Sequence, residues 1–483
     1  MKIIITGAGI AGLSTYLHLR KHLPQPPGDS PDSQHTIHIY ESHHPRTSSH
    51  PLSPETFDTL SSSTALVGGG LGVSPNGMRV LHDLSPELHA AVAAQGYPCE
   101  KFIFLGQNGW TLGVQRTGDR GGFEGPGGRE EVCVASSRGG LWKCLMDEVG
   151  EGVVRYRKVV SVREREDGGG VVVFEDGGEE GADLVVGADG VRSVVRSGLF
   201  GASYGPIYTG VSGIGGFIKG GPLPARVADN RAMVFTFGRT GFFGYASGSP
   251  VEANNLMWWS SFETDSLPSK TNLNPDEIKA ELKKRHSAWA DPTVQDIVDK
   301  AEVESIYPTW VLPDLPHWGE NGIVLVGDAA HAMSPTTGQG ASQALEDGQT
   351  LALLLAETLT KAYASAPTEG ESPLVQDGKE AVALTLHLFY KIRKPRVAEI
   401  VERGRKLDRG KTTMGVVAEY SMYCFLWVMM HFPSVGEFIC SSSYTMQLTP
   451  FAAKRILGDV NVKLYGWSAK QEIKEAFEKM EVI

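Results

Sequence analysis

The amino-acid sequence predicts an α/β fold with a mostly parallel sheet, a second domain with a mixed β-sheet, and helices at the C-terminal end. Residues 2–6 form an apolar run that ends at glycine, and residues 10–19 then carry apolar side chains at helical spacing. Residues 205–320 are rich in aromatic, strand-like runs, and helical periodicity returns at residues 339–361 and 380–405. We therefore expect residues 1–204 and 321–410 to form one domain, residues 205–320 the mixed β-sheet domain, and residues 411–483 a helical region.

Composition and charge exclude several classes of protein. The 483 residues are 41% hydrophobic and 21% charged, as in folded globular proteins. A formal net charge of −11 disfavours a nucleic-acid partner. Five widely spaced cysteines without a CxxC pair indicate neither a disulfide framework nor a zinc site, so we expect no bound metal and a reducing, cytoplasmic location. Glycine is unusually frequent, at 58 positions, which predicts tight turns or close backbone approaches.

The first glycine cluster lies between the first predicted strand and the first predicted helix. In GAGIAG (residues 7–12) the glycines permit a tight turn, a close approach of a pyrophosphate, and packing of the helix against the sheet. Free amide groups at the helix start favour an anion. An acidic residue that binds a ribose is expected at the end of the second strand, where Glu41 lies beyond a Pro-rich insertion at residues 24–34. The pattern predicts a Rossmann-like dinucleotide site.

Two further motifs place acidic residues directly after apolar strands. GADG contains Asp189 and precedes Arg192, and taken alone it is equally compatible with a surface turn. In GDAAHAMSPTTGQGASQALEDG (residues 327–348) a buried strand ends at Asp328 and a helix begins near Gly340. A carboxylate at such a strand end can accept a hydrogen bond from a ribityl hydroxyl, and the amide groups near residues 338–341 can face an electron-rich ring.

The ordered set of GAGIAG, Arg138 in SSRGGLWKCL, GADG and the Asp328-containing string resembles the group A flavin-dependent monooxygenases, the p-hydroxybenzoate and salicylate hydroxylase-like family, in its fungal secondary-metabolite type. The resemblance covers residues 1–410. It implies one FAD across a Rossmann-like FAD-binding domain, a β-sheet domain over the substrate, and no separate nicotinamide domain. It also implies that NADPH or NADH reduces the flavin, which reacts with O2 to a flavin hydroperoxide that hydroxylates or epoxidises the substrate.

The resemblance implies FAD-binding positions residue by residue. Glu41 resembles the ribose ligand, Arg138 the arginine that contacts FAD, and Asp328 the ligand of the ribityl and phosphate groups. Asp189 matches a motif tied both to FAD and to the nicotinamide donor. The expected set is Gly7, Gly9, Ala11, Gly12, Glu41, Gly69, Gly70, Arg138, Asp189, Asp328, Gly338, Gly340 and Ala341.

Arg192 is the expected catalytic residue. In some fungal relatives of this family an arginine directly after the GADG motif and a tyrosine in the following sheet are catalytic. Arg192 fits the arginine, whereas the aligned strand offers Phe235 and Phe237 in place of a tyrosine. By its chemistry Arg192 could orient a substrate oxyanion or a peroxide oxygen, or form a structural salt bridge. His331 is expected to be a buried histidine beside the cofactor rather than a general base.

Aromatic residues in the predicted strands of residues 205–320 indicate a sizeable apolar substrate. Because side chains alternate along a strand, only half of them can face the cofactor. We expect an aromatic, indolic or polycyclic, polyketide-like molecule and O2 as partners of a monomer or homodimer. The expected pocket residues are Phe235, Phe237, Tyr245, Trp258 and Pro335.

The most apolar stretch is residues 413–432, which Glu419 and His431 interrupt. Its uninterrupted part is about half as long as a membrane span of about 20 residues. It favours a buried or ligand-lining helix over a membrane anchor, with a peripheral membrane contact as the alternative.

Other functions fit the same sequence. A flavin oxidase, dehydrogenase or halogenase could use the same cofactor fold, although the paired Trp258 and Trp259 lack the following Ile-Pro typical of halogenases. A flavin-binding protein without turnover would also retain Arg138 and the Asp328-containing string.

Overall fold

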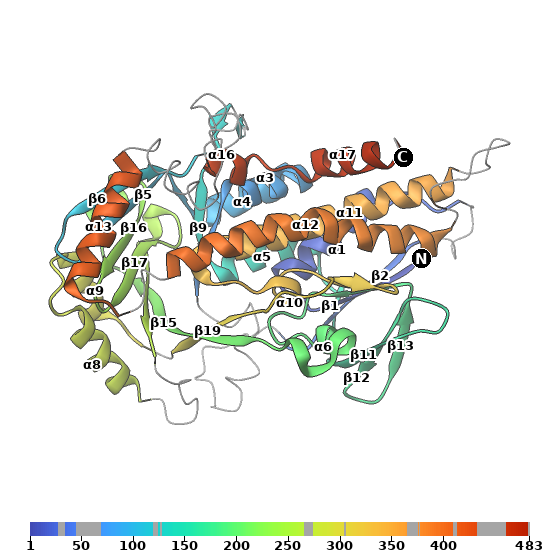
Figure 1. The fold of residues 1–483 in the computed structure, drawn as a ribbon, viewed down its shortest axis with the longest axis horizontal. Coiled ribbons are helices and arrows are strands. Elements are labelled where there is room, and N and C mark those ends of the chain that lie inside the picture. Colours follow the sequence, from blue (N-terminus) through green and yellow to red (C-terminus); the bar gives the residue numbers. More distant parts are fainter. Residues whose placement is uncertain are drawn as a thin grey trace.

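The structure is a computed structural model that describes residues 1–27, 34–44, 69–118, 124–125, 128–264, 274–303, 306–364, 375, 377–408, 413–431 and 460–481. Figure 1 shows two large sheets at opposite ends of an elongated molecule, with the long helices α11 (Gly340–Tyr363) and α12 (Gly378–Asp408) running lengthwise beside each other. The predicted α/β fold is confirmed. The expected helix at residues 380–405 is also confirmed, as the greater part of α12.

A six-stranded sheet with parallel central strands forms the core of the first domain. Ile3 in the central strand β1 pairs with Ile37 on one side and with Leu184 on the other. Ile3, Ile4 and Ile5 are fully buried, as expected for a parallel strand covered on both faces. Only the edge strand β20 is antiparallel to its neighbour. The strand order is β10 (Val154–Tyr156), β2 (Thr36–Glu41), β1 (Lys2–Thr6), β14 (Leu184–Gly187), β21 (Ile323–Leu325) and β20 (Gly319–Glu320).

Helices cover this sheet and pack closely on one another. A Cβ atom on Gly348 of α11 would lie 2.9 Å from the Thr15 nitrogen of α1, so only glycine allows the two helices to approach this closely. The other helices of this domain are α1 (Ile10–His22), α3 (Pro75–Leu84), α4 (Pro86–Gln95), α5 (Arg138–Val149), α6 (Val194–Phe200) with the 3-10 helix η2 (Gly201–Tyr204), and α10 (Asp328–His331) with the 3-10 helix η4 (Pro335–Thr337).

The second domain is a seven-stranded mixed sheet with α8 and α9 on one face. Its strands include β5 and β6 from the first part of the chain, and β16 pairs with β5 in parallel. The expectation that residues 1–204 belong wholly to the first domain is therefore corrected. The order is β19 (Tyr307–Val311), β15 (Ile207–Lys219), β18 (Asn255–Glu263), β17 (Gly241–Ser247), β16 (Ala232–Gly238), β5 (Lys101–Gly106) and β6 (Thr111–Arg116).

Smaller elements complete the described residues. A meander, β11 (Val159–Glu164), β12 (Gly170–Phe174) and β13 (Glu179–Ala182), pairs antiparallel throughout. A three-stranded sheet places β9 (Cys133–Ser137) between β3 (Gly70–Val73) and β4 (Tyr97–Cys99), and β7 (Glu124–Gly125) pairs with β8 (Arg129–Glu130). The remaining helices are α7 (Ala225–Ala228), η3 (Val251–Ala253), α8 (Pro275–His286), α9 (Pro292–Lys300), α13 (Val416–His431), α16 (Val460–Tyr465) and α17 (Ala469–Glu481).

Candidate functional site

The first glycine turn is fixed by backbone contacts that exclude larger residues. Gly7 has φ +101°, and a Cβ atom on it would lie 2.5 Å from the carbonyl oxygen of Ala188. A Cβ atom on Gly12 would lie 1.9 Å from the carbonyl oxygen of Gly7. Gly9 precedes the first residue of α1 and has no side chain to cap the helix. The amide groups at the start of α1 therefore meet the end of the central strands, in the arrangement that binds a pyrophosphate.

Glu41 points at this turn from the end of β2. Its Oε2 accepts the backbone N–H of Ala8 at 2.8 Å, and its Oε1 accepts from the Ser42 hydroxyl and the His43 N–H, both at 3.1 Å. Burial alone would raise the pKa of Glu41, but hydrogen bonds from His43, Ala8 and Ser42 outweigh it and lower the pKa. Glu41 is therefore an ionised carboxylate next to the glycine turn.

The Asp328-containing string meets the first glycine turn in space, although more than 300 residues separate them. Gly327, at φ +58°, ends the strand region before α10, and a Cβ atom on it would lie 2.8 Å from the Cβ atom of Ala11. Ala11 thus contacts the second motif. Asp328 is the first residue of α10 and is half-buried. Asp328 therefore directly follows the point where the two motifs meet.

Open space lies in front of the long helix α11. Gly338 adopts the left-handed conformation, with φ +60°. A Cβ atom on Gly338 or on Gly340 would meet no atom within 4 Å. Gln339 precedes α11 without a side-chain cap, so the first N–H groups of α11, including that of Ala341, are available to a ligand.

Asp189 has a structural partner on one oxygen and none on the other. Its Oδ2 accepts the N–H groups of Val194 and Val195 at 2.7 and 3.2 Å and so caps α6. Its Oδ1 is buried without a hydrogen-bond partner among the described residues. Burial raises the pKa of Asp189. An orphaned buried oxygen beside Gly190, whose φ is +76°, fits a ligand that supplies the missing donor.

Arg196 is a site residue to which the sequence assigned no role. Its side chain is buried and donates to the backbone oxygens of Val191 at 2.6 Å, Ala329 at 3.0 Å and Tyr204 at 3.0 Å. It therefore ties the GADG loop to α10. The available signal was an arginine in the first turn of a helix that begins at Val194, shortly after the motif.

The loop opposite these motifs joins the two domains. The Arg138 N–H donates to the Gly69 oxygen at 2.9 Å, and Gly70 pairs with Ser137. A Cβ atom on Gly69 would meet no atom within 4 Å, whereas one on Gly70 would lie 1.7 Å from Sδ of Met257 in β18. Gly70 is therefore one point where the first domain touches the seven-stranded sheet.

The seven-stranded sheet has two different faces, and the predicted pocket residues divide between them. Phe235 and Phe237 are half-buried and share a face with Met257, which contacts Gly70. Tyr245 and Trp258 lie on the other face, in the core under α8 and α9. Other aromatic rings lie on the first face. The ring centroid of Phe235 lies 5.4 Å from that of Phe104 and 6.0 Å from that of Trp259. The ring centroid of Phe237 lies 5.1 Å from that of Phe242.

The structure places two predicted pocket residues, Tyr245 and Trp258, away from the face that carries Phe235 and Phe237. Tyr245 donates from Oη to Asp291 Oδ2 at 2.9 Å, and Trp258 stacks on Phe243 at 5.9 Å. Both follow from the register, which pairs Tyr245 with Val234 and with Trp258 rather than with Phe235. Pro335 lies apart from both faces, exposed at the start of η4.

Arg192 is exposed in the turn that follows Gly190. Its guanidinium carbon lies 6.0 Å from the ring centroid of Trp310 in β19, and that ring lies 5.8 Å from Tyr208 in β15. Arg192 therefore lies where the first domain meets the edge of the second sheet. Its catalytic role stays a prediction.

A buried ionic network contacts two residues of the Asp328-containing string, Gly327 and His331. Asp347 Oδ2 accepts the Gly327 N–H at 2.8 Å and lies 2.6 Å from His331 Nε2, while Arg393 Nε donates to Asp347 Oδ1 at 2.8 Å. Burial alone would raise the pKa of Asp347, but the charges of His331 and Arg393 lower it. Arg393 Nη1 also donates to Glu346 at 2.6 Å. His331 is buried as predicted, whereas no pattern in the sequence singled out the buried Arg393.

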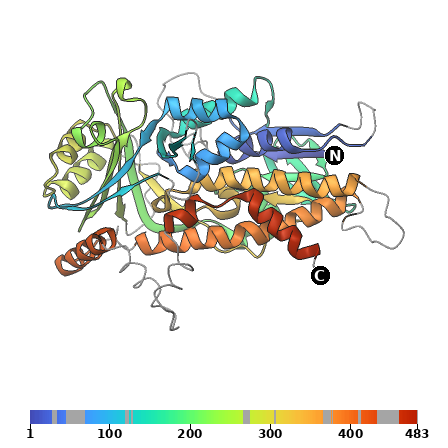
Figure 2. The same ribbon diagram turned by 90° about the horizontal axis from the view of Figure 1, so that it is seen from above.

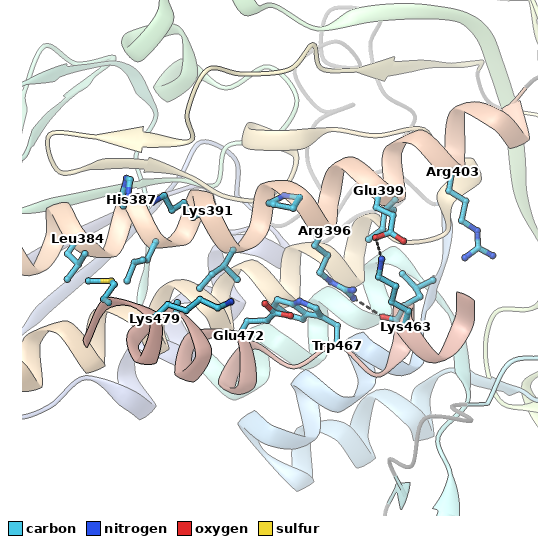
Figure 3. A pocket seen from close by; sticks show the side chains of 17 residues that line it. Leu384, His387, Lys391, Arg396, Glu399, Arg403, Lys463, Trp467, Glu472 and Lys479 are labelled. Carbon is cyan, nitrogen blue, oxygen red and sulfur yellow. Dashed lines mark hydrogen bonds and ion pairs between the residues drawn. The ribbon is translucent and has the colours of Figure 1, made fainter. Parts of the chain in front are cut away.

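A separate groove of about 780 Å³ lies between α12, α16 and α17 and contains none of the glycine motifs. Figure 3 shows Arg396 and Trp467 pointing toward each other within it. Arg396 donates to Glu346, and the guanidinium carbons of Arg393 and Arg396 lie 4.8 and 4.6 Å from the Trp467 ring centroid. The groove therefore meets the outer end of the ionic network.

Together these contacts define a dinucleotide-binding α/β protein whose nucleotide site continues to the start of a long helix and an aromatic sheet face. Within the described ranges, no group of three or more His, Cys, Asp or Glu side chains could hold a metal ion.

Comparisons with known proteins give the class a family. Residues 73–366 match the FAD binding domain family. The chain is 32% identical over 312 residues to 6-hydroxynicotinate 3-monooxygenase of Pseudomonas fluorescens, covering 61% of this chain and 74% of that protein. It is 35% identical over 227 residues to zeaxanthin epoxidase of Arabidopsis thaliana, covering 46% of this chain and 32% of the epoxidase. The structure of Klebsiella pneumoniae HpxO with FAD and uric acid has the same fold, with a TM-score of 0.65, 20% identity, and coverage of 88% and 92%.

The chain therefore belongs to the FAD binding domain family and is an FAD-dependent monooxygenase. The orphaned Asp189 oxygen, the open space at Gly338 and Gly340, and the turn at Gly7 and Gly12 all fit FAD as its cofactor.

Proposed function

We propose that this monooxygenase uses NADPH or NADH and O2 to insert one oxygen atom into an apolar aromatic, indolic or polyketide-like molecule. One oxygen atom enters the product, the other leaves as water, and the nicotinamide supplies the two electrons. The observation that carries the substrate class is the aromatic sheet face of Phe235, Phe237 and Trp259, which lies on the side of Met257 and Gly70. Aromatic side chains gathered on one face of a sheet suit a flat apolar ligand.

Several residues would hold the FAD. The turn at Gly7–Gly12 would take the pyrophosphate, Glu41 the ribose, and Asp328 the ribityl chain, with Arg138 and Asp189 beside it. The N–H groups at Gly340 and Ala341 would face the ring. When bound, FAD supplies the electron transfer and the oxygen chemistry, while the chain orients the substrate and excludes water.

Arg192 would orient an oxygen anion of the substrate. The exposed position of Arg192 in its turn and its place beside Trp310 at the junction of the two domains support this role. Replacement by Ala should abolish product formation while FAD content stays unchanged. Loss of FAD from the Arg192→Ala variant would instead assign Arg192 to cofactor binding or to folding.

The decisive experiment follows the two half-reactions of the purified FAD-bound protein. NADPH, and in parallel NADH, is added without oxygen while flavin absorbance is recorded, and ¹⁸O2 is then admitted with a panel of phenols, indoles and polycyclic aromatics. Reduced flavin and one ¹⁸O atom in a product would support the proposal. Reduction followed only by hydrogen peroxide across the panel would indicate an oxidase, and flavin that neither nicotinamide reduces would contradict the proposed electron donor.

A further inference from the structure

Helix α13 lies on the aromatic face of the seven-stranded sheet. Tyr423 Oη is 2.7 Å from the Phe237 carbonyl oxygen and accepts the Gln107 N–H at 2.9 Å. A Cβ atom on Gly113 of β6 would lie 2.5 Å from Met430, so glycine lets the helix lie directly against the strand. Figure 2 shows α13, in red-orange, at the edge of the molecule next to that sheet.

The outward side of α13 is apolar as well. Val417 is 81% exposed and Trp427 is 43% exposed, and the Trp110 ring contacts Tyr420 at 5.8 Å between centroids. Nine large hydrophobic side chains are exposed in the described part of the chain, and six of them lie on α13 or contact it. We call these six the α13 patch: Trp110, Val416, Val417, Tyr420, Phe425 and Trp427.

The exposed side of α13 carries no Asp, Glu, Lys or Arg side chain, and the exposed His431 ends the helix. Glu419 is the only Asp, Glu, Lys or Arg between Val416 and His431, and it points inward, where its Oε2 lies 3.2 Å from Arg239 Nε and its Oε1 2.7 Å from Tyr423 Oη. Trp and Tyr are the residues enriched at the level of lipid headgroups. With a net charge of −11, the chain has no overall attraction for anionic lipid.

The size of the α13 patch favours a membrane over a second copy of the chain as its binding partner. A 16-residue helix is about 24 Å long and about 10 Å wide. The area that such a helix can cover is much smaller than the roughly 800 Å² that each partner buries in a stable protein complex. A single apolar helix is, however, enough to bind reversibly in a lipid interface.

We propose that the α13 patch docks this protein onto the surface of an uncharged, zwitterionic lipid bilayer, with α13 lying in the interface. Within the described residues, no helix has the length and apolar character needed to cross a membrane. Lipid binding by α13 does not depend on the proposed oxygen insertion, so the two can be tested separately.

Flotation of the full-length FAD-bound protein with phosphatidylcholine vesicles tests the proposal. The wild type should float with the vesicles, and the double variant Val417→Glu, Trp427→Glu should partition about tenfold more weakly, because two exposed apolar groups are lost. Ile207→Glu is the matched control, because Ile207 is 52% exposed on β15, outside the patch. Equal FAD content and thermal midpoints would show that both variants are folded.

A second readout uses Cys424, an exposed thiol on α13. Its alkylation rate, followed by peptide mass spectrometry, should fall severalfold when vesicles are added. Absence of flotation by the wild type, or equal flotation by the double variant, would overturn the proposal. A wild-type dimer that the double variant converts to a monomer would overturn it in favour of a second copy, and a Cys424 thiol already unreactive without vesicles would show that the protein covers the patch itself.

Discussion

The two sheets of this protein are built in different ways. The six-stranded sheet and its helices contact each other at glycines and at the buried ion pair of Asp347 and Arg393. Few other residue types would fit at these positions. The seven-stranded sheet is held by aromatic side chains that alternate between a face covered by helices and a face toward Gly70. The first arrangement fixes a cofactor site by backbone geometry, and the second, under the proposed function, would allow the substrate contacts to change.

The largest expected effect is on the ionic network. Arg393→Met should lower the free energy of unfolding by about 3–5 kcal/mol, because buried Asp347 would lose its guanidinium partner and buried Glu346 would keep only that of Arg396. Lys394→Met is the adjacent control, since its ion pair with the exposed Asp314 is worth at most about 1 kcal/mol. Urea unfolding measures both variants. Equal stability of the two variants would show that the network does not hold the first domain.

The glycine turn comes next. Gly12→Ala should weaken FAD binding about 100-fold, or about 3 kcal/mol, because its Cβ atom would meet the Gly7 oxygen and the backbone cannot yield. Equilibrium dialysis against FAD gives the affinity. Gly221→Ala, whose Cβ atom would meet nothing within 4 Å, should keep wild-type affinity. Unchanged FAD affinity in Gly12→Ala would mean that α1 can shift away from the sheet.

The division between the two sheet faces can be tested with Tyr245. Tyr245→Phe removes the hydrogen bond to buried Asp291 and should cost about 1–2 kcal/mol of stability without changing FAD content. Phe235→Leu, on the opposite face, should alter the substrate KM more than stability. Chemical unfolding and steady-state assays separate the two variants. If Tyr245→Phe kept full stability but changed the substrate preference, Tyr245 would be assigned to the substrate pocket after all.

The smallest expected effect is at acid pH. Burial would raise the pKa of Glu180, but hydrogen bonds from Tyr40, Lys2 and His38 outweigh it and lower the pKa from 4.5 to about 2. The stabilising charge is therefore fully present above pH 4.5 and is lost as the pH falls toward 2. Because Glu180 is partly exposed, the contribution is less than about 1 kcal/mol.

In the Glu180→Gln variant the thermal midpoint should depend less on pH over that interval than in the wild type. Glu175→Gln, in an exposed ion pair with Lys158, serves as the control. A Glu180→Gln profile as steep as that of the wild type would assign the acid sensitivity to other carboxylates.

The sequence predicted the first domain better than the second for a physical reason. A glycine required by a positive φ or by a close contact, as at Gly7 and Gly12, is visible as a residue type at fixed spacing after an apolar strand. Arg393 was missed because its partners lie 46 and 47 residues away on another helix. The adjacent carboxylates Glu346 and Asp347, shortly before the apolar run at residues 351–355 of the same helix, were the signal that a buried cation was needed.

Face assignment in the second domain depends on strand register, which spacing does not specify. Alternation along the strands implies that only half of the aromatic residues can share one face, but it could not say that Val234, Tyr245 and Trp258 share the face under α8 and α9. The parallel pairing of β16 with β5 joins segments more than 120 residues apart. No local pattern marks such a pair.

The contact between Ala11 and Gly327 has a consequence for biosynthesis. β14 ends at Gly187 and its parallel neighbour β21 begins at Ile323, so roughly 7–27 s of translation separate the two strands at 5–20 residues per second. During that time β14 presents an unpaired edge on the ribosome. Nascent chains arrested before Ile323 should therefore bind chaperones and fail to retain FAD, whereas chains released after Asp408 should retain it.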